Sequence, residues 1–236
     1  AQLKRDLAAE VAAVLAFSAI ANHDRVGLIL FSDRVEKHVP PAKGPTHVLR
    51  VVSEILNAKP ASPRTDLEPA LRYLNHVVRR RSVAFLISDF IAPPCERLLR
   101  VTARRHDLVS LVVGDKRESA LPAVGFVDFE DAETGRRLVV DTSHPPTRRA
   151  LLTRQTERRQ NLLRQLARAR SDAIELNAGE RSRPRAGGND DVFSLQGGVL
   201  AVIELDRQRV RPGQLAGAVV DADLVFLHQE ADAPHQ

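Results

Sequence analysis

Apolar residues form two kinds of pattern along the chain: helical spacing in some stretches and short continuous runs in others. Apolar residues recur at helical spacing in five stretches, and the predicted helices are residues 3–22, 46–57, 67–80, 96–106 and 145–169. Short continuous apolar runs, typical of strands buried on both faces of a sheet, separate these helices. They are residues 26–31, 82–88 and 108–113, with a last short strand at 173–176. Since strands and helices alternate, we predict an α/β fold with a doubly wound, mostly parallel sheet and helices on both faces.

Two segments depart from this alternation. Residues 35–39 alternate in polarity and run into two prolines, which predicts a short edge strand antiparallel to the strand before it. Residues 124–129 and 137–140 surround a turn and predict a hairpin. Residues 141–143, Asp-Thr-Ser, are expected to cap the last helix.

The character of the sequence changes after the last predicted strand. Residues 179–191 are polar and contain Gly, Pro and Arg, as in a linker or a disordered stretch. Residues 199–205 and 218–228 could form strands, but they do not continue the alternation. We therefore divide the chain into an α/β domain, residues 1–177, and a divergent, partly disordered C-terminal extension, residues 178–236.

Composition narrows the class of protein. Of the 236 residues, 43% are hydrophobic and 28% charged, as in soluble globular proteins. No apolar run reaches the ~18 residues that span a bilayer, and no signal-peptide pattern opens the chain. The chain begins with Ala and contains no Met, so we expect a fragment or a processed product.

The single cysteine, Cys95, excludes an internal disulfide and a Cys-rich zinc site. It follows two prolines at a predicted helix start, where a thiolate could be favoured. A half-buried, small apolar residue is the plainer interpretation.

Three residues with oxygen-bearing side chains, Asp33, Thr65 and Asp89, are candidates for the place where a doubly wound sheet binds a ligand. Asp33 and Asp89 each follow a Ser at the end of a predicted buried strand, and the carboxyl ends of such strands border the ligand crevice. For Asp33 a turn-capping role is the better interpretation; for Asp89 a cation ligand and a turn cap are equally good. Thr65 opens a helix in the pattern Thr-Asp-Leu-Glu, and a capping box with Glu68 fully explains these residue types. The Thr65 hydroxyl can also serve a site only if its loop faces the crevice.

Signatures of common enzymes are absent from the sequence. We find no glycine-rich phosphate loop, no dinucleotide-binding glycine motif and no nucleophile elbow. The eight histidines show no metal-ligand spacing on one helix face. We therefore expect no catalytic residues and no small-molecule substrate.

The last predicted helix is rich in arginine, and the chain has a net charge of +5. Its arginines are Arg148, Arg149, Arg154, Arg158, Arg159, Arg164, Arg168 and Arg170. They could bind RNA or DNA, which makes a basic nucleic-acid-binding protein the alternative function. A solvated face opposite an apolar stripe is the plainer interpretation, and no aromatic residue interleaves to stack on bases.

Several segments together resemble the bacterial domain of unknown function 58 family over residues 3–176. The segments that carry the resemblance are residues 7–20, 22–33, 64–67, 80–90, 103–107, 121–122, 128–135 and 140–143. Beyond residue 177 the sequence departs from the family's usual continuation.

That family resembles von Willebrand factor A domains, which bind a divalent metal at an adhesion site built from three loops. The resemblance implies that Thr65 and Asp89 supply two of these loops. The first loop, Asp-x-Ser-x-Ser, is absent, and the family's strand order implies that the missing first strand is central. We therefore assign Mg²⁺ or another divalent cation to the intact protein rather than to this fragment.

The resemblance also implies a partner, a MoxR-type AAA+ ATPase, and a role in chaperone-like assembly. The expected function is thus a non-enzymatic, metal-dependent protein-interaction module. We expect a cytoplasmic location, although full-length family members often carry membrane segments before this domain.

Overall fold

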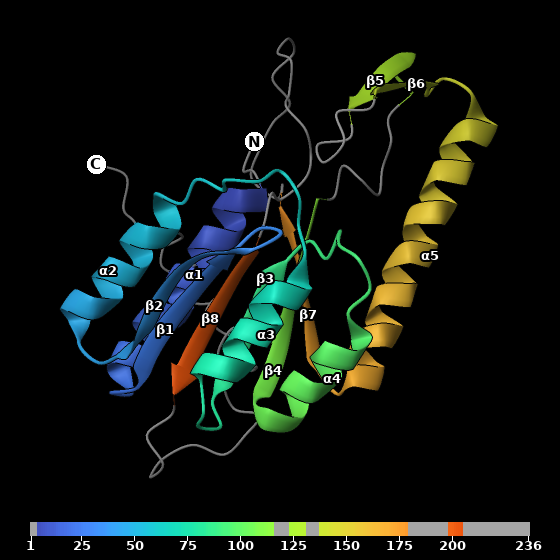
Figure 1. Ribbon diagram of the computed structural model, residues 1–236. Coiled ribbons are helices and arrows are strands. Elements are labelled where there is room, and N and C mark those ends of the chain that lie inside the picture. Colours follow the sequence, from blue (N-terminus) through green and yellow to red (C-terminus); the bar gives the residue numbers. More distant parts are fainter. Residues whose placement is uncertain (1–3, 116–122, 131–136, 179–197, 205–236) are drawn as a thin grey trace, which may run out of the picture.

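A six-stranded sheet with helices on both faces forms the body of the protein (Figure 1). The computed structural model describes residues 4–115, 123–130, 137–178 and 198–204. The run predicted at residues 218–228 lies outside them. None of the helices in these segments is long and apolar enough to cross a membrane.

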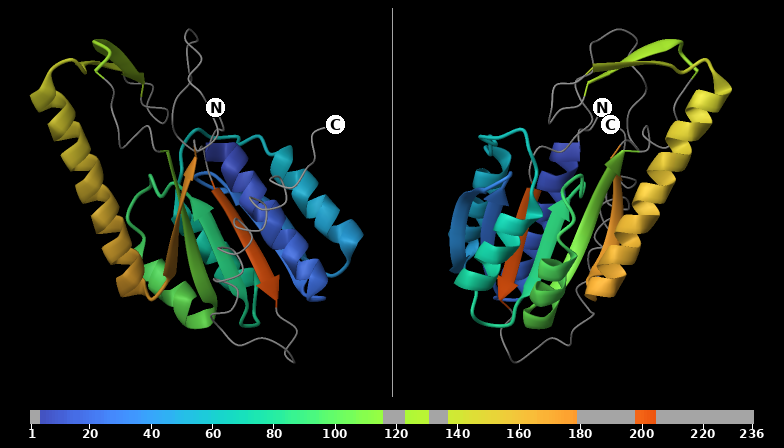
Figure 2. Two further views of the ribbon diagram at one scale, coloured as in Figure 1. Left: turned by 180° about the vertical axis from the view of Figure 1, so that it is seen from behind. Right: turned by 45° about the vertical axis from the view of Figure 1, so that its right-hand side comes forward.

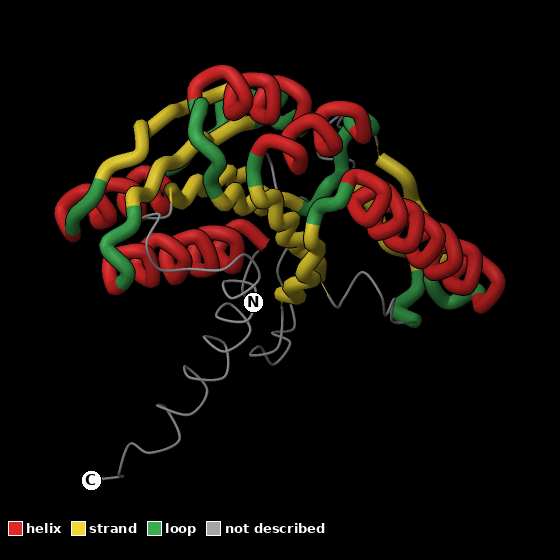
Figure 3. The backbone as a smooth tube through the Cα atoms, turned by 90° about the horizontal axis from the view of Figure 1, so that it is seen from below, coloured by secondary structure: helices red, strands yellow, loops and turns green. Residues whose placement is uncertain are grey.

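Two helices cover one face of the sheet and three cover the other (Figures 1 and 3). On the first face lie α1 (Lys4–Ala21) and α2 (Pro45–Leu56). On the second lie α3 (Leu67–Val77), α4 (Glu96–Arg105) and α5 (Pro145–Ala169). All five predicted helices are confirmed, with ends that shift by up to three residues.

The sheet contains β1 (Arg25–Phe31), β2 (Val35–Ala42), β3 (Val83–Ser88), β4 (Asp107–Asp115), β7 (Asp172–Ala178) and β8 (Gly198–Glu204). Their order across the sheet is β2-β1-β8-β3-β4-β7. Strands β3, β4 and β7 are parallel neighbours, while β8 is antiparallel to both β1 and β3. It follows that β1, β3, β4 and β7 all run in one direction.

Strand β8 corrects two expectations about the sheet. The sheet is mixed rather than mostly parallel, because β8 lies antiparallel in its centre (Figure 2). The sequence also predicted that the central strand of the sheet is missing. That position is filled by β8, which belongs to the segment assigned to the C-terminal extension. Apolar side chains on both faces of β8 explain this placement, since Leu200 and Ala201 enter opposite cores and are 0% and 3% exposed.

Local chemistry explains two smaller differences. Strand β2 is antiparallel to β1 at the sheet edge, as expected, but it continues through Pro40 and Pro41 to Ala42. An edge strand tolerates prolines because one side of its backbone needs no partner. Helix α5 has His144 as its N-cap without a side-chain cap bond, so the cap expected from residues 141–143 is wrong. Asp141 instead accepts a hydrogen bond from the backbone of Ser143, at 2.9 Å.

The predicted hairpin is confirmed as β5 (Phe126–Glu130) paired antiparallel with β6 (Arg137–Asp141). It forms a separate two-stranded sheet near the start of α5 (Figure 1).

Candidate functional site

The carboxyl ends of β1 and β3 lie on either side of the first residues of β8. Phe31 is paired with Gly198, and Ile87 with Val199. Ser32 directly follows β1 and Ser88 ends β3, and both are 0% exposed. This edge is where a doubly wound sheet places its ligand crevice.

Thr65 lies in the loop that precedes α3 and is 4% exposed. The next residue ties this loop to the end of β1, because the Asp66 backbone N–H donates to the Ser32 carbonyl at 3.0 Å. Asp66, and not Thr65, is the N-cap of α3, with its Oδ1 accepting from the Glu68 backbone N–H at 2.9 Å. The capping box expected at Thr65 is therefore wrong by one residue.

Asp89 follows β3 and is 8% exposed. Its Oδ1 accepts a hydrogen bond from the Ile91 backbone N–H at 3.0 Å, and the Ser88 hydroxyl accepts one from Phe90 N–H at 3.1 Å. Between them Phe90 adopts a left-handed backbone, with φ of 54°. Such a conformation is costly for a bulky residue and is found preferentially at functional sites. The turn fixes the orientation of the Asp89 carboxylate.

Asp33 is held by side chains around the β1–β2 turn. Its Oδ1 accepts from Arg34 Nε at 3.0 Å and from the Ser32 hydroxyl at 3.3 Å. The Arg34 hydrogen bond is the main reason that the pKa of Asp33 is lowered from its usual 3.8, and a hydrogen bond from Ser62 adds to it. The turn interpretation therefore accounts for Asp33.

Cys95 is the N-cap of α4 and is 8% exposed. Burial, followed by the nearby carboxylates Asp66 and Glu68, raises the pKa of its thiol to about 12. The thiol therefore stays protonated at neutral pH, and the thiolate considered from sequence is excluded.

The side chains of this edge fit a hard divalent cation in their chemistry. Thr65 and Asp89 offer a hydroxyl and a carboxylate oxygen, the ligand types that Mg²⁺ and Ca²⁺ prefer. No group of three His, Cys, Asp or Glu side chains that could hold a metal occurs in the described residues. A site built on Thr65 and Asp89 would therefore combine one hydroxyl with one carboxylate rather than a cluster of such side chains.

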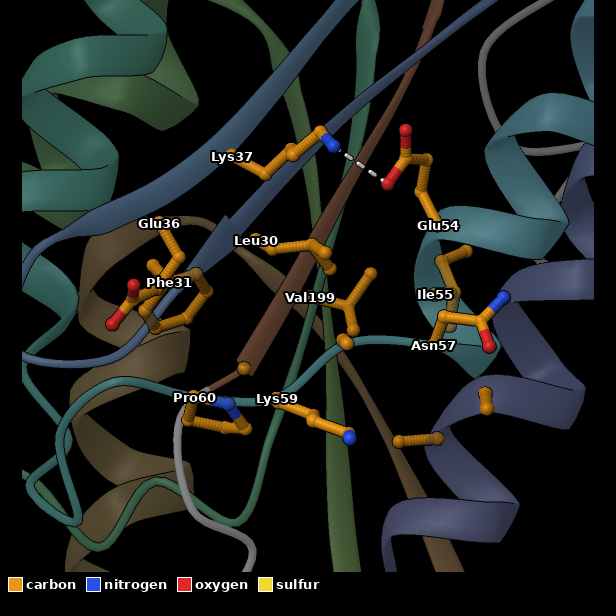
Figure 4. A pocket seen from close by; sticks show the side chains of 14 residues that line it. Leu30, Phe31, Glu36, Lys37, Glu54, Ile55, Asn57, Lys59, Pro60 and Val199 are labelled. Atoms are coloured by element: carbon orange, nitrogen blue, oxygen red, sulfur yellow. Dashed lines mark ion pairs between the residues drawn. The ribbon is translucent and has the colours of Figure 1, made fainter.

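A pocket of about 330 Å³ opens beside this edge, between the ends of β1 and β8 and the helices α1 and α2 (Figure 4). Its apolar floor includes Leu30 and Val199, and its rim carries an ion pair between Lys37 and Glu54 with N–O distance 2.8 Å.

Glu36 joins the pocket to the candidate site, because it accepts hydrogen bonds from the Ser32 hydroxyl at 2.5 Å and from the Ala61 backbone at 3.2 Å. Sequence reasoning missed Glu36 and this pocket. A carboxylate in an exposed edge strand gives no signal of its own, and the strand that completes the pocket comes from the far end of the chain.

Comparison with known proteins identifies relatives over the greater part of the chain. A family model described as "Protein of unknown function DUF58" matches residues 1–161. The uncharacterized protein Rv1480 of Mycobacterium tuberculosis (strain ATCC 25618 / H37Rv) is 38% identical over 136 residues, which are 56% of this chain and 43% of that protein. The uncharacterized protein Mb1516 of Mycobacterium bovis gives the same values.

A third relative, the uncharacterized protein MAV169 of Mycobacterium avium, is 36% identical over 107 residues, 43% of this chain and 63% of that protein. The chain thus spans less than half the length of the first two relatives. No solved structure matches the chain significantly.

Proposed function

The chain belongs to the DUF58 family, and from this premise we propose that it is a non-enzymatic module that binds a partner protein at the carboxyl edge of its sheet through a divalent cation. The proposal is supported above all by one observation. Thr65 and Asp89 are both buried residues with oxygen-bearing side chains, and they lie in separate loops, one before α3 that bonds to the end of β1 and one after β3.

The sequence assigned the cation to the intact protein, because the first loop of the site is absent from this chain. Since β8 fills the centre of the sheet and pairs with both β1 and β3, we propose that Thr65 and Asp89 hold Mg²⁺ in this chain as well. A hard cation that is bound by few protein oxygens has coordination positions left for water or for a carboxylate of the partner protein. The protein's own contribution is to fix these donors. The Asp66–Ser32 backbone bond anchors the first loop, and the turn at Phe90 orients the second.

The proposed partner is a MoxR-type AAA+ ATPase, in a complex with a chaperone-like role in assembly. The support for this partner is membership of the DUF58 family, since the resemblance to that family is what implies a MoxR-type AAA+ companion. The carboxyl edge of the sheet is suited to binding a partner protein, because its loops are positioned by buried strands on a rigid sheet.

The test is capture of the purified AAA+ ATPase encoded by the source organism on the immobilised 236-residue chain, with Mg²⁺ or with EDTA. We expect Mg²⁺-dependent capture that Asp89→Ala reduces at least tenfold. The matched control is Asp172→Ala, an exposed carboxylate at the opposite edge of the sheet, which should capture as the wild type does. Capture that is indifferent to EDTA and to Asp89→Ala would overturn the metal-dependent mechanism, and no capture would overturn the partner.

A further inference from the structure

Three helices end side by side at the amino edge of the sheet, and each ends in arginines. These are Arg79, Arg80 and Arg81 after α3, Arg104 and Arg105 in the last turn of α4, and Arg168 and Arg170 at the end of α5. The turns lead into β3, β4 and β7, which are adjacent strands. Val83 is paired with Asp107, and Val109 with Asp172, so the three turns lie within about two strand spacings, roughly 10 Å. We call these seven residues the arginine foot.

The arginine foot is exposed and poorly neutralised. All seven side chains belong to exposed residues. Two carboxylates lie in the same three turns, and one of them, Asp107, pairs with Arg81 at 3.3 Å. The other, Asp172, is exposed. The foot therefore keeps a strong positive charge.

Helix α5 extends this charge away from the foot. Arg149, Arg154, Arg158, Arg164 and Arg168 are all exposed. At 3.6 residues per turn, Arg149, Arg164 and Arg168 lie on the side of the helix opposite buried Leu166 and Ala169, and we call these three the arginine stripe. Arg158 lies three turns before Ala169, on the same side of the helix as that residue. Glu157 is the one acidic residue in the helix. At 1.5 Å per residue, the arginine stripe from Arg149 to Arg168 is about 28 Å long. Helix α5 forms the outer flank of the molecule (Figure 2).

Two other arginines of α5 have structural partners and do not belong to the stripe. Arg159 pairs with Glu175 at 2.6 Å, and Arg148 donates to the carbonyl of Ser143 at 3.1 Å. Within the stripe, Arg164 also donates to Asn161 Oδ1 at 2.5 Å, a bond inside the helix. Cations near helix ends also stabilise helix dipoles, which accounts for the last turns of α4 and α5. That effect fades within one turn and does not explain arginines along the whole of α5.

The chemistry of this surface favours a regular polyanion. Protein interfaces are anchored by buried aromatic or large apolar residues, and amphipathic membrane helices present large apolar side chains beside their basic ones. Among the exposed large apolar residues of the described segments, one, Val101, lies on α4 and none lies on α5. None of these exposed residues on α4 or α5 is aromatic. This disfavours single-stranded nucleic acid, whose bases stack on aromatic side chains. A duplex needs only a rigid row of cations along its phosphates.

We propose that the arginine foot and the stripe on α5 form a binding surface for the phosphate backbone of double-stranded nucleic acid, without sequence preference. This surface is separate from the cation site, which lies at the other edge of the sheet. The proposal therefore stands or falls independently of the protein partner.

The test is binding of the full chain to fluorescein-labelled DNA and RNA duplexes of about 20 base pairs, followed by fluorescence anisotropy over a series of salt concentrations. Three double variants each remove two charges. Arg80→Gln with Arg104→Gln changes the foot, Arg149→Gln with Arg164→Gln changes the stripe, and Arg34→Gln with Arg50→Gln, in the β1–β2 turn and α2, is the control. Circular dichroism checks that each variant folds.

We expect duplex binding at low salt, with the slope of log Kd against log salt reduced by about 2 in the foot and stripe variants and unchanged in the control. No binding at low salt, or an equal effect of the control pair, would overturn the proposal. Tighter binding to vesicles containing phosphatidylserine than to either duplex would overturn it in favour of a membrane surface.

Discussion

His106 is a buried ionisable residue that no hydrogen bond in the described structure accounts for. It follows α4, is 1% exposed, and neither ring nitrogen has a hydrogen-bond partner. Burial, and then the positive charges of Arg105 and Arg81, lower its pKa from the usual 6.5. The ring is therefore neutral in the native protein at neutral pH. Protonation would place an uncompensated charge in the interior.

Because the pKa of His106 is lower in the folded than in the unfolded chain, acid should weaken the fold. Above 6.5 the residue is neutral in both states; below it the unfolded chain takes up the proton first. We expect the free energy of unfolding to fall between about pH 7 and pH 5, with His106 contributing at most about 1.4 kcal/mol per pH unit. Urea denaturation of wild type and His106→Leu measures this.

The variant should lose that part of the pH dependence, while the exposed control His76→Leu should keep it. Equal slopes in wild type and His106→Leu would show that the ring is not buried as a neutral group.

At the residue scale, sequence predicted the types of side chain at the site better than their roles. Thr65 and Asp66 are both good N-cap residues, and sequence could not say which one begins α3. In the structure the Asp66 side chain caps α3, and the Asp66 backbone N–H donates to Ser32, a residue more than 30 positions earlier in the chain. A contact between segments that far apart gives no local signal. Glu36 was missed for the same reason, because its partners Ser32 and Ala61 come from different loops.

At the element scale, the stability of the sheet depends on β8. It separates β1 from β3 and pairs with both over most of their length. Gly198, at its start, faces Phe31, and a Cβ there would collide with the Phe31 ring and stand 2.9 Å from the Ile87 carbonyl oxygen. The beginning of the strand therefore has space for glycine alone.

Removing the side chain at the centre of β8 should be costly. Leu200 is 0% exposed, so we expect Leu200→Ala to lower the free energy of unfolding by about 2–5 kcal/mol. Val139→Ala, on the hairpin at 63% exposure, is the control and should change it by less than about 0.5 kcal/mol. Urea unfolding measures both. A Leu200→Ala change as small as the control's would mean that β8 does not occupy the centre of the sheet.

Sequence predicted the elements well and the place of β8 poorly, for a physical reason. Helices and their faces follow from local periodicity, and α5 was predicted with its observed bounds. A short apolar run such as residues 198–204 shows that a strand is buried on both faces, but it carries no information about its neighbours or its direction. Those depend on which position in the sheet the rest of the fold leaves open.

At the scale of the whole molecule, the two proposed surfaces lie at opposite edges of one sheet. The carboxyl edge gathers Ser32, Thr65 and Asp89, while the amino edge gathers the arginine foot. The carboxyl edge offers a carboxylate to a cation, and the amino edge offers arginines to a polyanion. The two ligands would therefore not compete for one surface. The direction of β1, β3, β4 and β7 alone establishes this division.

The central claim is that Thr65 and Asp89 bind a divalent cation together. The most direct test is to titrate Mn²⁺ into the purified chain and to measure the free ion by electron paramagnetic resonance. Mn²⁺ serves as a spectroscopic substitute for Mg²⁺ because both prefer oxygen ligands. We expect one bound ion per chain that Mg²⁺ displaces, with affinity at least tenfold weaker in Thr65→Ala and in Asp89→Ala. The exposed controls Thr153→Ala and Asp172→Ala should bind as wild type does. Stoichiometric binding that survives both site variants, or no binding by the folded wild-type chain, would contradict the claim.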